Sequence, residues 1–183
     1  MTMKVYKNRN LTLKICLSAM CMALAFALPF VTGYIPEIGN ALSPMHLPAF
    51  LFGIVAGPFF GGALAFLAPV LRSVMFGAPA PLFPRAITMS FELMAYALVF
   101  GLLYKLLSKK LPYIYVSLVS AMIVGRLVGG IVKIVLLKLG VIAKYNLALF
   151  ISGYVTESIP GIVVQLLVIP PVVLALRRAK LID

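Results

Sequence analysis

The sequence predicts an all-α integral membrane protein, a single bundle of six transmembrane helices with both termini on the cytoplasmic side. The chain of 183 residues is 63% hydrophobic, with a mean hydropathy of +1.14, and soluble domains are about half apolar. Long apolar segments alternate with short loops. No hydrophilic stretch is long enough for a second domain, so we expect one membrane domain over residues 1–183.

A tight apolar hairpin is the clearest element. Residues 43–77 contain two apolar segments joined at Gly57-Pro58, with almost no polar linker. The joint is too short for a loop domain, so the segments should be antiparallel neighbours. We expect helices over about 45–56, short for a full span, and 59–76. Glycines recur at four-residue spacing, which allows close helix packing in lipid: Gly53, Gly57 and Gly61.

The other four helices follow from the remaining apolar segments. They are expected over about residues 12–30, 85–107, 113–137 and 147–176. Pro170-Pro171 should bend the last helix or end it early. Residues 1–11 are polar and should be partly disordered or lie on the membrane surface. Residues 31–44, 77–84 and 138–146 should form loops on the outer side, and the proline-rich 77–84 cannot be helical.

Basic residues set the expected orientation. With an even number of spans, most of them fall on the side of the termini: Lys4, Lys7, Arg9, Lys14, Lys105, Lys109, Lys110, Arg177, Arg178 and Lys180. Only Arg85, Lys138 and Lys144 flank the other side. Basic loops face the cytoplasm, which explains the net charge of +12 better than nucleic-acid binding does.

The first predicted helix carries small residues at four-residue spacing: Ala19, Ala23 and Ala27. Such a stripe allows close approach of another helix, either within this bundle or on a partner protein. Cys16 and Cys21 lie on different faces of the same helix. Neither belongs to a metal-binding spacing, so both are interpreted as small buried apolar residues.

Five charged side chains fall inside the predicted spans: Arg72, Glu92, Arg126, Lys133 and Glu157. Each costs about 2.5–3.5 kcal/mol near the bilayer centre, so it should pair, reach water or serve function. On the predicted topology all five lie in the outer half or the centre of the membrane. Helical spacing joins Arg126 to Lys133 and Glu92 to Tyr96 on single faces. We therefore expect a polar cavity that opens outward between the third and sixth helices.

Several roles stay open for these residues. Arg126 either contacts ligand or pairs with Glu92 or Glu157, and Lys133 either contacts ligand or reaches out to water. The three cations outnumber the two carboxylates, which favours a ligand with a carboxylate or phosphate. His46, the only histidine, is interpreted as an interfacial or loop-bonding residue. Aromatic and amide side chains are secondary candidates for the pocket: Phe91, Asn146 and Tyr154, beside Tyr96.

The chain resembles the S components of energy-coupling factor (ECF) transporters over nearly its whole length. The resemblance rests on the six spans, the alanine stripe and the Gly57-Pro58 hairpin. It also rests on the stretches PVLRSVMFGAPAPLFPRAITMSFELMAYALVFGLLYKLL, GRLVGG and SIPGIVVQLLVIP. It looks most like the vitamin-binding group. The metal-binding group has an extended N-terminal strand with an early histidine, which has no counterpart here.

This resemblance implies a substrate-capture subunit of a vitamin importer in the bacterial plasma membrane. Its partners would be a membrane coupling subunit and two ABC ATPases, since the chain has no Walker motif. The family's docking surface maps onto Ala19, Ala23 and possibly Ala27. Pantothenate is slightly favoured as substrate because of its carboxylate, with pyridoxine or hydroxymethylpyrimidine as alternatives. We expect no enzymatic activity, no cofactor and no metal.

Three other classes compete with this reading. An autonomous ion-coupled transporter usually shows internal repeats, and none is evident between residues 1–90 and 91–183. A membrane-embedded hydrolase would need a nucleophile with its base or several metal ligands, for which one histidine is a poor basis. A purely structural membrane subunit would use the buried charges only for packing.

Overall fold

The computed structural model describes residues 2–32, 44–77, 82–108, 110–142, 146 and 158–182. These ranges contain helices and turns and no strand. The elements are α1 (Thr2–Thr32), α3 (His46–Val55), α4 (Pro58–Phe76), η1 (Leu82–Ala86), α5 (Ile87–Leu106), α6 (Leu111–Lys138) and α8 (Ile159–Arg178). The predicted outer loops therefore lie largely outside the described residues, as does the predicted start of the last helix at residue 147.

Five of these helices are long and apolar enough to cross a membrane. They are Leu11–Phe30 within α1, Pro58–Phe76, Leu82–Leu106, Leu111–Lys138 and Ile159–Arg178. The helix α3 is equally apolar but has only ten residues, and a full span needs about 20. The described part of the chain thus has five helices long enough to span a membrane, and α3 is short, as the sequence predicted.

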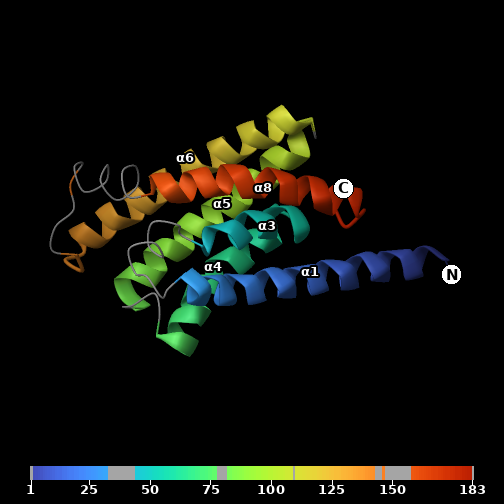
Figure 1. Cartoon of the computed structure of the whole chain (residues 1–183). Coiled ribbons are helices and arrows are strands. Elements are labelled where there is room, and N and C mark those ends of the chain that lie inside the picture. The colour runs from blue at the N-terminus through green and yellow to red at the C-terminus, as the bar shows by residue number, and fades with distance from the viewer. Residues whose placement is uncertain are drawn as a thin grey trace.

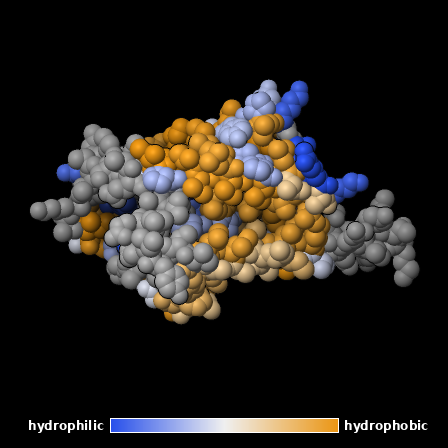
Figure 2. All heavy atoms as spheres, in the orientation of Figure 1, coloured by the Kyte–Doolittle hydropathy of each residue, from blue (hydrophilic) through white to orange (hydrophobic). Residues whose placement is uncertain are grey.

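The helices alternate in direction along one bundle (Figure 1). Both termini lie at the same end of it, and we call the opposite end, where α3, α5 and α8 begin, the distal end. The helix α5 lies in the middle and packs against α3, α4 and α6, while α1 and α8 pack against α3 from the outside. Figure 2 shows a broad hydrophobic surface along the bundle, with basic side chains near the end that carries the termini.

The glycines of the hairpin bring backbones into contact, as their spacing predicts. A Cβ atom at Gly53 would overlap the backbone of Ala97 on α5, and one at Gly61 would overlap the backbone of Phe52 on α3. Gly57 turns the chain between α3 and α4 with a φ of 90°, a conformation that costs glycine little. Gly53 and Gly61 therefore permit close packing of the helices, while Gly57 forms the turn between them.

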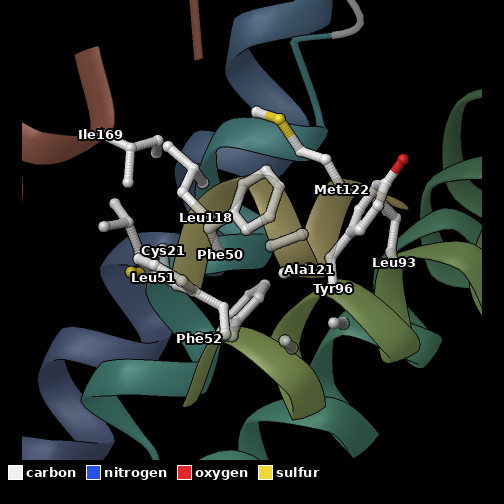
Figure 3. Packing of buried hydrophobic residues seen from close by; sticks show 14 of the residues in the cluster. Cys21, Phe50, Leu51, Phe52, Leu93, Tyr96, Leu118, Ala121, Met122 and Ile169 are labelled. Carbon is white, nitrogen blue, oxygen red and sulfur yellow. The ribbon is translucent and has the colours of Figure 1, made fainter. Parts of the chain in front are cut away.

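Aromatic and aliphatic side chains fill the space between α3, α5, α6 and α8 (Figure 3). Phe50 is at the centre: its ring stacks on Tyr96 at a centroid distance of 5.0 Å and meets Phe100 edge-on at 5.6 Å. Leu118 and Ile169 complete this core from α6 and α8. Offset and edge-on aromatic pairs add about 0.5–1.5 kcal/mol each beyond area burial. This core fixes the rotation of α3 and α5 against each other.

Four local predictions can be compared with the structure. The helix α1 begins at Thr2, so residues 2–11 are helical rather than disordered. The helix α8 continues through Pro170-Pro171 to Arg178, which spanning helices tolerate when neighbours satisfy the freed backbone groups. Cys16 is exposed and only Cys21 is buried. In the proline-rich segment, the turn Leu82–Ala86 is helical in its bonding, although Phe83 keeps an extended backbone.

Candidate functional site

A buried cluster of three polar side chains lies toward the distal end of the bundle. Tyr96 Oη donates a hydrogen bond to Glu92 Oε1 at 2.6 Å. The Nε2 atom of His46 lies 3.6 Å from the same carboxylate oxygen. The exposed fractions are 8% for His46, 7% for Glu92 and 1% for Tyr96. A carboxylate this far from water is retained only where polar partners offset its lost hydration.

The fold positions each member through its helix. Glu92 and Tyr96 are one turn apart on α5, so their side chains meet on one face. His46 is the first residue of α3, and its ring lies 5.3 Å from the Tyr96 ring. Phe50, one turn later on α3, stacks on Tyr96 from the core side. Figure 3 shows the Tyr96 ring at the edge of the core cluster.

The helix α6 closes the cluster from the other side. Gly125 packs directly on the Tyr96 ring, and a Cβ atom there would overlap the ring carbons. The next residue, Arg126, is half-buried. Its positive charge is close enough to attract the Glu92 carboxylate, although no ion pair between them is among the contacts of the described residues. The predicted link between Glu92 and Arg126 is thus electrostatic, while the short contacts of Glu92 go to His46 and Tyr96.

The other predicted site residues are spread more widely. Arg72 is buried on α4, with its guanidinium 5.3 Å from the centre of the Phe30 ring of α1. Lys133 is half-buried on α6, about two turns beyond Arg126 toward the distal end, and Asn146 is exposed. Phe91 packs edge-on against Phe66 of α4 at 5.1 Å. Glu157 and Tyr154 lie outside the described residues.

Apart from small hydroxyl residues, two buried polar residues in the described part of the chain escaped prediction. His46 was expected at the interface, but it is buried against Glu92. Its place in the first turn of a helix that pairs with α5 was the available signal. Gln165 on α8 is 1% exposed, and it stood out only as an amide within an otherwise apolar helix. In both cases, the spacing of residues along one helix does not show which side chain of another helix they contact.

Metal-ligating residues do not gather in the described part of the chain. No group of three or more His, Cys, Asp or Glu side chains occurs there. The cluster combines one carboxylate, one imidazole and one phenol, with a guanidinium nearby. Such a set has the hydrogen-bonding groups and charges with which protein pockets can hold a polar small molecule.

The alanine stripe of α1 faces away from the bundle. Ala19, Ala23 and Ala27 are exposed, whereas Cys21 and Ala25 on the same helix are buried in the core. The described residues of this chain therefore leave the stripe uncovered. The sequence allowed the stripe to pack either within this bundle or on a partner protein. Among the described residues, no helix of the bundle covers it.

Comparison with known proteins places the chain in a family. Neither the curated proteins nor the solved structures include a significant match. The family model for "ECF transporter, substrate-specific component" matches residues 13–173, which include α3 to α6 and nearly all of the apolar part of α1. Together with five apolar helices, this match makes the chain a multi-pass protein of the cell membrane. It belongs to the family of substrate-specific (S) components of ECF transporters.

Proposed function

We propose that this S component captures a water-soluble vitamin or vitamin precursor at the cluster of His46, Glu92, Tyr96 and Arg126. The observation that supports this most is the buried Glu92 carboxylate with two polar partners. Purely structural packing would be served as well by apolar residues of similar volume. A polar group retained inside a membrane protein is by default a candidate for substrate contact.

The chemistry of the cluster suits a small polar molecule with both charge and hydrogen-bonding groups. The guanidinium of Arg126 offers several N–H donors in a fixed plane, which match a carboxylate. Pantothenate therefore remains the first candidate, because it carries a carboxylate together with hydroxyl groups. Pyridoxine and hydroxymethylpyrimidine, which lack the carboxylate, are the alternatives. The apolar core beneath the cluster would exclude water from one side of the bound molecule.

Mass spectrometry of small molecules released from the purified full chain tests this function directly. Binding of pantothenate, pyridoxine and hydroxymethylpyrimidine to the same preparation then ranks the candidates. The variant Arg126→Ala should weaken pantothenate binding by about tenfold or more, since a charge-assisted contact contributes about 1.5–3 kcal/mol. Arg178→Ala, at an exposed arginine of α8, is the matched control. Equal affinities in both variants would contradict the role of Arg126.

ECF S components work with a coupling subunit and ATPases, and we propose that the alanine stripe of α1 is the docking surface here. Small residues allow another helix to approach closely. Ala23→Trp should therefore reduce co-purification with the coupling subunit and ATPases while leaving ligand binding intact. Val116→Trp, on the exposed face of α6, is the control. Normal assembly of Ala23→Trp with the coupling subunit would refute the docking surface. A separate measurement tests the competing function: uptake driven by an ion gradient, in vesicles that contain only this chain, would favour an autonomous transporter.

A further inference from the structure

A second buried polar group lies on α8. The Gln165 side chain is 1% exposed, and its Oε1 accepts no hydrogen bond within the structure described above. The other residues on this face of α8 are apolar or lack a side chain: Gly161, Ile169 and Val173. An amide oxygen that is buried without a donor opposes folding. Gln165 therefore needs an explanation that packing does not supply.

Helix register places Gln165 in the same layer as His46. The helices α3 and α8 pack together and run in the same direction, away from the distal end (Figure 1). Phe50 of α3 and Ile169 of α8 belong to the same core cluster (Figure 3). His46 precedes Phe50 by four residues and Gln165 precedes Ile169 by four residues, which in each case is one helical turn of about 6 Å. Both side chains thus lie one turn from the Phe50 and Ile169 level of the core, on its distal side.

The Glu92 carboxylate has a second oxygen, Oε2. Both Tyr96 Oη and His46 Nε2 contact the other oxygen, Oε1. The contacts described here include no donor to Oε2. The layer therefore presents one fully buried acceptor without a donor, Gln165 Oε1, together with Glu92 Oε2, which is not among the buried atoms that lack a partner. A buried site with acceptors selects strongly for molecules that supply the matching donors, because an analogue without them leaves the acceptors unpaired.

We propose that Gln165 is a specificity-determining residue of the substrate site and that its Oε1 accepts a hydrogen bond from a hydroxyl or N–H group of the substrate. This inference rests on the proposed function and restricts the class of substrate that the site can bind. The substrate carries at least one hydrogen-bond donor, which Gln165 requires, and a second donor would suit Glu92. A carboxylate without neighbouring hydroxyl, amide or amino groups does not meet this requirement.

The variant Gln165→Leu tests the inference in the full-length protein, because leucine has a similar volume and no polar atom. Its ligand-free form should melt at a higher temperature than wild type, since the unsatisfied oxygen is gone. Its affinity for whichever of pantothenate, pyridoxine and hydroxymethylpyrimidine binds wild type should fall about tenfold or more. For an analogue of that probe with the contacting donor replaced by hydrogen, the loss should shrink to about twofold or less.

Matched variants keep the outcome interpretable. Val163→Leu, on the exposed side of α8, should change neither melting nor affinity. Gln165→Met provides a second apolar replacement in case the leucine variant does not fold. A stabilised variant that binds weakly supports the inference, whereas a destabilised variant with unchanged affinity would show that Gln165 is only structural.

The two proposals fail in different ways. Wild-type protein that binds none of the three probes would refute the proposed function and this inference with it. Wild-type protein that binds a probe, together with a Gln165→Leu variant of equal affinity, would overturn only the role of Gln165.

Discussion

The variant Tyr96→Phe removes one hydroxyl from the centre of the cluster and little else. The ring keeps its stacking on Phe50 at 5.0 Å and its contact with Gly125. The lost hydrogen bond is 2.6 Å long and ends on the Glu92 carboxylate, within the range of charge-assisted O–H···O⁻ bonds. Hydrogen bonds to charged groups contribute about 1.5–3 kcal/mol. We expect a loss of stability of that size.

Thermal unfolding of the purified protein in detergent measures this loss. In a chain of this size each kcal/mol shifts the melting temperature by about 2–4 °C, so the expected decrease is on the order of 3–12 °C. The affinity for the vitamin that wild type binds should fall as well, because Glu92 then keeps only His46 to orient it. Tyr115→Phe, at an exposed tyrosine of α6, provides the control. Melting and affinity equal to those of Tyr115→Phe would refute the reasoning.

Three glycine variants test the packing that supports the cluster. Gly125→Ala should displace the Tyr96 ring and weaken vitamin binding. Overpacking should also lower the free energy of unfolding by about 1–3 kcal/mol. Unchanged binding would show that the position of the ring does not affect the site. Gly53→Ala should be the most damaging, because its methyl group meets the Ala97 backbone rather than a side chain, and a normal yield of folded protein would argue against the α3–α5 contact. Gly57→Ala meets little steric obstruction but places a side chain at φ 90° and ψ 160°, so it should lose about 1–3 kcal/mol from backbone strain, measured as a drop in melting temperature.

Several features of the fold could be predicted because they depend on local sequence. Apolar length places the helices in the membrane, and the joint at Gly57-Pro58 leaves α3 and α4 no other arrangement than a hairpin. The recurrence of glycine every four residues at Gly53, Gly57 and Gly61 predicted close backbone approach, which the structure confirms at Gly53 and Gly61. The pairing of Glu92 with Tyr96 also followed from spacing on a single helix.

Contacts between helices were harder to predict. His46 was assigned to the interface because a lone histidine at a helix start has many possible surroundings, yet it is buried against Glu92. Arg72 was grouped with the other intramembrane charges, whereas its guanidinium lies over the Phe30 ring of α1. Depth in the membrane can be counted along one helix, but the direction of a side chain around the bundle axis cannot.

The amino-acid sequence by itself determined that this protein is a membrane-embedded helical S component and that Arg72 and Glu92 carry charge within its apolar helices. Hydrophobic length and helical period act within one segment and need no knowledge of its neighbours. Only the tertiary structure decided that His46 of α3 meets Glu92 of α5 and that the Gln165 side chain of α8 is buried without a donor to its Oε1. Those contacts depend on the rotation and register of whole helices, which the packing of Phe50, Tyr96 and the close glycines sets collectively.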